Sequence, residues 1–143
     1  MMVDAVLAKK GHEVATVNPA ATLATVAQRL RLERIGALVV VEGGEMVGMI
    51  SERDVVHAFA EHRGGASEIK VADVMTRNVI TCRGEDSLTR ILALMTRHRV
   101  RHLPVMDGGR LAGLISIGDA VKHRLDELEL EASVLRDAYI VSH

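Results

Sequence analysis

The amino-acid sequence repeats itself at an interval of 65 residues, measured from Gly48 to Gly113. Each of these glycines begins a similar heptapeptide, Gly-Met-Ile-Ser-Glu-Arg-Asp in the first half and Gly-Leu-Ile-Ser-Ile-Gly-Asp in the second. The interval also relates other positions without a gap, namely Thr16 and Thr81, Thr22 and Ser87, Leu23 and Leu88, and Gly43-Gly44 and Gly108-Gly109. Such repetition indicates an internal duplication, so we expect two similar units.

Each unit is expected to contain a strand, a helix, two strands and a second helix. In the first unit these are an apolar segment at Val14–Val17, a helix capped by Thr22, strands Ala37–Val41 and Met46–Ile50 around a glycine turn, and a helix beginning at Ser51. In the second they are Val79–Thr81, a helix capped by Ser87, strands Leu103–Met106 and Leu111–Ile115, and a helix beginning at Ser116.

The predicted fold is therefore mixed α/β (α+β), built from tandem β-α-β-β-α repeats. A unit this small buries its sheet poorly alone, so the two are expected to pack sheet to sheet around a pseudo-two-fold axis. The expected organisation is a lead-in helix in residues 1–11, a first repeat in 12–62, a linker in 63–72, a second repeat in 73–126 and a helical extension in 127–143.

Composition limits the partners and the compartment. The net charge of −1, with only one Phe, one Tyr and no Trp, provides neither general attraction nor stacking platforms for nucleic acid. No segment approaches the ~20 consecutive apolar residues that span a bilayer. Cys82 is the single cysteine, which excludes an intrachain disulfide and fits a reducing compartment, so we expect a cytoplasmic protein without nucleic-acid or membrane partners.

The strand–helix junctions are the candidate binding elements. Ser51 and Ser116 each precede a helix whose first turn contains an aspartate, Asp54 or Asp119. The N–H groups of a first helical turn lack intrahelical partners and can bind an anion or a sugar hydroxyl. Helix capping alone also explains a serine followed by an aspartate. The presence of both residue types in both copies favours ligand contact in addition to capping.

This tandem repeat resembles a pair of cystathionine β-synthase (CBS) domains, the Bateman module. The resemblance covers residues 10 to 125 and includes Asp73-Val74-Met75-Thr76 before the second repeat and Arg101-His102-Leu103-Pro104-Val105 within it. It implies an adenosine-containing ligand in clefts between the repeats and regulation of an attached or partner protein.

The resemblance also implies roles for individual residues. Asp54 and Asp119 would accept hydrogen bonds from ribose hydroxyls, with Ser51 and Ser116 facing ribose or phosphate. The remaining implied nucleotide-binding residues are Ala15, Thr16, Gly36, Ala37 and Arg53 in the first half, and Ile80, Thr81, Arg101, His102, Pro104 and Gly118 in the second.

The two implied sites should differ in ligand or in affinity. Gly36-Ala37 stands where the second repeat has Arg101-His102, which removes two cationic donors that Arg53 could replace. We expect AMP as the ligand, followed by ATP or ADP, with NAD(H) as a further candidate because the sites are unequal.

No residue pattern indicates catalysis or a catalytic cofactor. The basic run from Arg97 to His102 can recognise phosphate or form a solvated helix end. His98 and His102 have a metal-like spacing, but a helix end is expected between them, so we predict no metal site. Cys82 corresponds to Val17 in the first repeat, which argues against a nucleophile. We therefore expect a protein that is not an enzyme.

The last helix is expected to run from about Ile117 toward Ile140 with an apolar stripe that continues past the repeat. Such a stripe has no intrachain sheet to cover, so a homodimer is predicted. The leading hypothesis is an energy- or redox-sensing regulatory protein. Two alternatives stay open: a structural interaction module with empty clefts, and an accessory subunit of an enzyme such as inosine monophosphate dehydrogenase.

Overall fold

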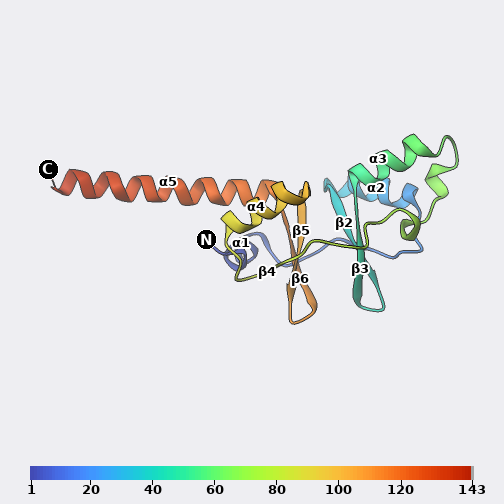
Figure 1. Ribbon diagram of the computed structural model, residues 1–143, viewed down its shortest axis with the longest axis horizontal. Coiled ribbons are helices and arrows are strands. Elements are labelled where there is room, and N and C mark those ends of the chain that lie inside the picture. The colour runs from blue at the N-terminus through green and yellow to red at the C-terminus, as the bar shows by residue number, and fades with distance from the viewer. Residues whose placement is uncertain (143) are drawn as a thin grey trace. The chain divides into compact units, whose positions relative to one another are not determined.

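The computed structural model describes residues 1–142, and His143, the last residue of the expected extension, lies outside them. The helices are α1 (Val3–Lys10), α2 (Leu23–Glu33), α3 (Glu52–Glu61), α4 (Leu88–His98) and α5 (Ile117–Ser142), with short 3-10 helices η1 (Ala66–Glu68) and η2 (Val71–Asp73). The strands are β1 (Thr16–Val17), β2 (Ala37–Glu42), β3 (Glu45–Ser51), β4 (Cys82–Arg83), β5 (His102–Asp107) and β6 (Arg110–Ser116) (Figure 1).

The mixed α/β fold and its duplication are confirmed. One three-stranded sheet has the order β1-β2-β3 and the other β4-β5-β6. In each sheet the short first strand runs parallel to the second, with Val17 opposite Val40 and Cys82 opposite Val105. These pairs are related by the repeat interval, so both sheets have the same register.

The predicted position of the first strand of the second repeat, Val79–Thr81, is wrong. Residues 79–81 have no regular secondary structure, and the strand β4 begins at Cys82. A two-residue strand is defined only where its backbone reaches the neighbouring strand, so sequence patterns cannot fix its ends to within a residue.

Local turn and capping signals are found where the sequence predicts them. Gly43 and Gly44 both have positive φ, as do Gly108 and Gly109, which fits the tight turns that join β2 to β3 and β5 to β6. The helix α2 begins after Thr22, whose side chain accepts a hydrogen bond from the N–H of Thr25. Ser87 caps α4 in the same way, through the N–H of Arg90.

The chain forms two compact units, and each unit is assembled from separate stretches of the sequence. Among the described residues, one unit contains residues 1–12, 81–108 and 112–142, and the other contains residues 13–80 with 109–111. In the first of these units, α1 packs against the second repeat: the N–H of Leu88 donates to the Met1 carbonyl at 3.1 Å, and Val3, Val6 and Leu7 are fully buried.

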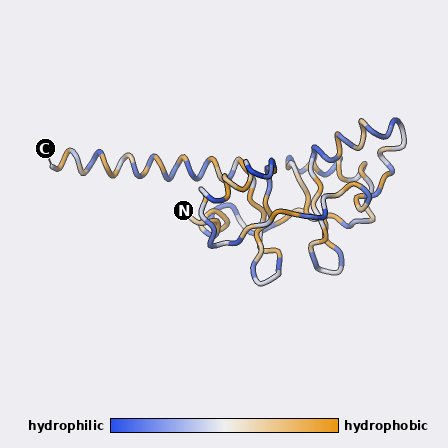
Figure 2. The backbone as a smooth tube through the Cα atoms, in the orientation of Figure 1, coloured by the Kyte–Doolittle hydropathy of each residue, from blue (hydrophilic) through white to orange (hydrophobic). Residues whose placement is uncertain are grey.

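Two glycines allow other side chains to pack closely against the last strand of each repeat. A Cβ at Gly113 would lie 2.8 Å from Cδ1 of Leu7, and a Cβ at Gly48 would lie 2.7 Å from Sδ of Met75. Each unit therefore combines one repeat with a segment that covers the middle of its last strand. Figure 2 shows the hydrophobic residues concentrated in the strands and in the helix faces beside them.

Candidate functional site

The first junction joins β3 to α3 through a reciprocal cap. The backbone N–H of Ser51 donates to Oδ2 of Asp54 at 2.8 Å, and the Ser51 hydroxyl donates to the same oxygen at 3.1 Å. The backbone N–H of Asp54 in turn donates to Oγ of Ser51 at 3.4 Å. Both side chains are partly buried. Capping therefore fixes the position of this carboxylate.

The second junction joins β6 to α5 with the same cap and one additional partner. The N–H of Ser116 donates to Oδ2 of Asp119 at 3.0 Å, and the N–H of Asp119 donates to Oγ of Ser116 at 3.1 Å. Nζ of Lys10, at the end of α1, donates to the same Oδ2 at 2.5 Å and to the Leu114 carbonyl at 2.8 Å.

Lys10 changes the electrostatic surroundings of Asp119 at this junction. Partial burial of the Asp119 carboxyl acts to raise its pKa, but the hydrogen bonds from Lys10 and Ser116 and the positive charge of Lys10 outweigh it, so the pKa lies below its usual value. Asp54 has no ion-pair partner among the described residues. The two aspartates are therefore equivalent in backbone geometry and different in electrostatic surroundings.

Each cap leaves some hydrogen-bonding groups unused. The first N–H of each helix is satisfied, because Glu52 donates to the Gly36 carbonyl at 3.0 Å and Ile117 donates to the Arg101 carbonyl at 2.8 Å. Among the described residues, the N–H groups of Arg53 and Gly118 have no acceptor outside their own helices. Oδ1 of Asp54 and of Asp119 likewise accepts none of the described hydrogen bonds. A donor and an acceptor thus remain at each junction.

In the first repeat, the strand pairing brings the expected site residues to one end of the sheet. Ala37 pairs with Ser51, and Thr16 pairs with Val39, two residues further along β2. The Ala15 carbonyl accepts a hydrogen bond from the N–H of Val39 at 3.1 Å. Ala37 is buried at 1% exposure, so only its backbone is available to a ligand, whereas Thr16 and Arg53 are exposed.

In the second repeat, the expected residues flank β4 and the start of β5. Ile80 and Thr81 are partly buried and precede β4, and Arg101 is exposed just before β5. His102, the first residue of β5, is partly buried, and Pro104 is buried inside the strand. The carbonyl of Arg101 accepts a hydrogen bond from the N–H of Ile117 at the start of α5, which places Arg101 beside the Ser116–Asp119 cap.

Two residues near the junctions were not identified from the sequence. Lys10 contacts Asp119 from a position 109 residues away, and no local pattern indicates such a pair. Arg29, in α2, donates to the Thr16 carbonyl and through Nε to Oε2 of Glu33 at 2.8 Å. The spacing of Arg29 and Glu33 by four residues predicts an ion pair on one helix face, but not the contact with β1.

The structure bears on two of the candidate groups considered from the sequence, the cysteine and the metal ligands. Cys82 is buried at 4% exposure, and burial with the nearby negative charge of Asp86 raises the pKa of its thiol to about 12, which opposes thiolate chemistry. Within residues 1–142, no three His, Cys, Asp or Glu side chains gather as a metal site would require. None of the described helices is long and apolar enough to cross a membrane.

Comparison with known proteins identifies a recurring domain. The model of the CBS domain matches residues 8–61 and 71–126. The CBS domain-containing protein YhcV of Bacillus subtilis is 32% identical over 114 residues, covering 79% of this chain and 80% of that protein.

Solved structures agree with this match. The CBS-domain containing protein ATU1752 of Agrobacterium tumefaciens is 39% identical, with a TM-score of 0.85 over 87% of this chain and 99% of that chain. The CBS domain pair of protein MJ0100, in complex with 5′-methylthioadenosine and S-adenosyl-L-methionine, is 22% identical with a TM-score of 0.78 over 89% of this chain and 98% of that one. At that identity the second comparison shows the fold.

Proposed function

Because this chain belongs to the CBS-domain family and carries two of its domains in tandem, we propose that it is a non-catalytic regulatory protein that binds an adenosine-containing ligand. The observation that carries the proposal is the pair of repeated junctions. Each presents an unused carboxylate oxygen, on Asp54 or Asp119, beside an unused backbone N–H at a helix start. A carboxylate accepts hydrogen bonds from a ribose diol, and a helix N-terminus favours phosphate.

The ligand we propose is AMP, followed by ATP or ADP and by NAD(H). Lys10 and Arg101 add positive charge near the second junction, and this favours a phosphorylated nucleoside there over an uncharged one. The first junction has Arg53 as its nearby cation but lacks a counterpart of Lys10, so we expect it to bind more weakly. The ligands described for MJ0100 make S-adenosyl-L-methionine a necessary comparison.

The regulatory step follows from differential binding. A ligand shifts a protein between two arrangements only when its affinity for them differs. We propose that the shift is read by a second protein, that the chain acts as a homodimer, and that it works in the cytoplasm, where a single reduced cysteine such as Cys82 is stable. Asp54 and Asp119 lie in the first turn of the helices that would transmit the change, and each takes part in the cap of its own helix.

The test is a calorimetric titration with AMP, ATP, NADH and S-adenosyl-L-methionine. Asp119→Ala is expected to weaken AMP binding at least ten-fold, because it removes a charged acceptor for the ribose. Asp54→Ala should affect a second, weaker binding step. Asp126→Ala, an exposed aspartate on α5 with no described ion pair, is the matched control and should bind as the wild type does.

Loss of a cap lowers stability by about 1 kcal/mol, so thermal unfolding must show that each variant is folded at the titration temperature. No heat from any of the four ligands would contradict the proposal and favour the alternative of an interaction module. Unchanged AMP affinity in a folded Asp119→Ala variant would contradict the assigned residues while leaving ligand binding intact.

A further inference from the structure

The C-terminal half of α5 is exposed to solvent, whereas its start is packed. Near its start, Ala120 and His123 are buried and the helix contacts α4 and α1. From Leu128 to Ser142 every residue except Ser133 is exposed. The ribbon shows this part of α5 extending beyond α1 and α4 (Figure 1). An isolated helical segment of that length is marginal in water, because most helical stability in proteins comes from packing an apolar face. The segment therefore requires a partner surface to be a stable helix.

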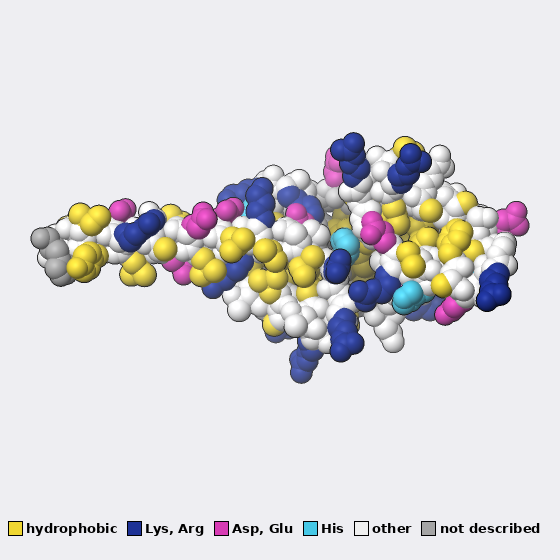
Figure 3. Space-filling view, turned by 90° about the horizontal axis from the view of Figure 1, so that it is seen from above, with side chains coloured by type: hydrophobic (Ala, Val, Ile, Leu, Met, Phe, Trp, Pro, Cys, Tyr) yellow, Lys and Arg dark blue, Asp and Glu magenta, His cyan; other side chains and the backbone are white. Residues whose placement is uncertain are grey.

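The exposed part of α5 carries a regular apolar stripe. Side chains separated alternately by four and three residues form it, and their exposure reaches 42% at Leu128, 72% at Leu135 and 65% at Tyr139. Figure 3 shows hydrophobic side chains along α5 with charges of both signs between them. This spacing is that of the a and d positions of a coiled coil, which are here Val121, Leu125, Leu128, Ala132, Leu135 and Tyr139.

We propose that α5 pairs with α5 of a second copy of this chain as a parallel, in-register, two-stranded coiled coil over residues 121–139. The charges flanking the stripe favour the parallel orientation of the two helices. In this arrangement Arg124 faces Glu129 of the second copy, and Glu131 faces Arg136 of the second copy, so the g and e positions meet with opposite charges. Glu129, Glu131 and Arg136 are all exposed in the single chain.

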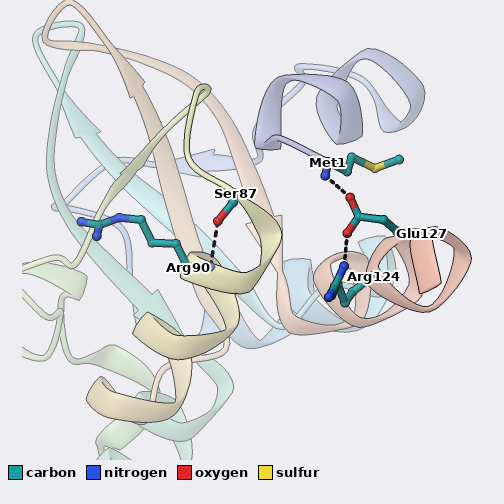
Figure 4. A network of polar contacts seen from close by, with 5 residues as sticks. All are labelled: Met1, Ser87, Arg90, Arg124 and Glu127. Carbon is teal, nitrogen blue, oxygen red and sulfur yellow. Dashed lines mark hydrogen bonds and ion pairs between the residues drawn. The ribbon is translucent and has the colours of Figure 1, made fainter. Parts of the chain in front are cut away.

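The remaining polar contacts of α5 are compatible with this pairing. Arg124 donates to Oε1 of Glu127 at 2.6 Å, and Oε2 of Glu127 is ion-paired with the amino group of Met1 (Figure 4). Glu127 occupies a c position, away from the stripe. A guanidinium has five N–H donors, so Arg124 can keep Glu127 and still meet a carboxylate of the second copy.

The antiparallel alternative is disfavoured by the same charges. The antiparallel register that covers the whole stripe places Leu125 opposite Leu135 and brings like charges together, namely Glu129 with Glu129, Glu131 with Glu131, and Lys122 with Arg136. Antiparallel registers shifted by seven residues relieve this repulsion but leave part of the stripe uncovered. The parallel arrangement alone among these covers the stripe and pairs opposite charges.

This inference rests on the proposed homodimer but not on nucleotide binding, which calorimetry tests separately. Sedimentation velocity first measures the dissociation constant of the full chain. Replacing both Leu128 and Leu135 by serine is expected to give a monomer whose globular part keeps its thermal stability, because both side chains are exposed. Leu130→Ser is the matched control: Leu130 is 66% exposed but lies off the stripe, so its dimer should be retained. A double-serine variant that still dimerises would overturn the proposal.

Exchanging the charges of Glu131 and Arg136 tests the predicted ion pairs between the two helices. Glu131→Arg and Arg136→Glu should each weaken the dimer on the order of ten-fold, since two symmetric attractive pairs become repulsive. The variant carrying both substitutions should recover wild-type affinity, because the pairs are restored with opposite polarity. Asp137→Arg makes the same change in charge on the outer face and should have no such effect. Failure of the double variant to recover would overturn the parallel register.

A cysteine tests the orientation directly. In a Cys82→Val background, Tyr139→Cys is expected to form a disulfide-linked dimer under mild oxidation, because equal positions meet across a parallel seam. In the antiparallel register that covers the stripe, the two cysteines would lie about 27 Å apart along the axis. A non-covalent dimer that forms no disulfide would overturn the orientation, and a wild-type monomer at tens of micromolar would overturn the dimer itself.

Discussion

At the scale of single residues, Lys10 distinguishes two otherwise equivalent aspartates. Asp119 is held by Lys10 and by its own helix cap, whereas Asp54 is held by its cap alone. Partial burial acts to raise the pKa of Asp119, but the hydrogen bonds and the charge of Lys10 lower it overall. A carboxyl whose pKa is lower in the folded state contributes stability above its unfolded pKa and loses that contribution as the pH falls.

Lys10→Met is therefore expected to reduce the free energy of unfolding at pH 7 by up to about 1 kcal/mol, the usual range for a partly exposed ion pair. The difference from wild type should shrink as the pH falls from about 4, the ordinary carboxyl range, through the lower pKa of Asp119 in the wild type, and should vanish once the carboxyl is protonated in both proteins. Urea unfolding followed by circular dichroism at several pH values measures this. Lys9→Met, at an exposed neighbour without a described ion pair, is the control, and a difference independent of pH would contradict the assigned coupling.

Cys82 gives a second prediction at this scale. Its thiol is buried and its pKa is raised to about 12, so thiolate is scarce in the folded protein at pH 8. An aromatic disulfide reagent should react at least 100-fold more slowly with native protein than with protein in 6 M guanidinium chloride. Fast reaction of the native thiol would show that this face of β4 opens, and would reinstate Cys82 as a candidate reactive group.

At the scale of elements, α2 and α4 each end at an arginine in a strained, left-handed backbone conformation. Arg34 and Arg99, at the ends of these helices and at equivalent repeat positions, have φ of 55° and 54°. Residues with a side chain adopt this left-handed conformation at a cost of about 1 kcal/mol, and glycine is favoured at helix ends for this reason.

Arg34→Gly and Arg99→Gly are each expected to leave stability unchanged or to raise it by up to about 1 kcal/mol, despite the greater freedom of glycine in the unfolded chain. Arg31→Gly, inside α2, is the matched control and should lower stability by about 1 kcal/mol. Thermal unfolding midpoints compare the three. An equal loss in all of them would mean that the end positions carry no relievable strain.

The elements also show what sequence patterns can predict. The caps at Thr22, Ser51 and Ser87 and the glycine turns depend on residues within four positions of one another, and all were predicted. The position of β4 was not, because a two-residue strand is set by its distant neighbour β5. The contacts of Lys10 with Asp119 and of Arg29 with Thr16 likewise depend on tertiary packing. The capping residues could therefore be predicted from the sequence, whereas the contacts that Lys10 and Arg29 make with distant residues could not.

At the scale of the whole molecule, the chain passes from one unit to the other and back again. The unit that contains α1, α4 and α5 is discontinuous, because the chain leaves it after residue 12 and returns at residue 81. The intervening residues 13–80 form the other unit together with residues 109–111. While that unit is folded, it fixes the span between the two segments; when it unfolds, the same residues become a flexible loop whose closure carries an entropic cost.

Destabilising the unit built on residues 13–80 should therefore also expose Cys82, which lies in the other unit. Val26 is fully buried in the core of the unit built on residues 13–80, so Val26→Ala is expected to lower the stability of that unit by about 1–3 kcal/mol. In increasing urea, the reactivity of Cys82 and the loss of circular dichroism should shift together to lower concentrations. Leu32→Ala, on the same helix but 70% exposed, is the control and should shift neither. If Cys82 stayed protected in Val26→Ala after part of the dichroism was lost, the two units would unfold independently and the chain path would not couple them.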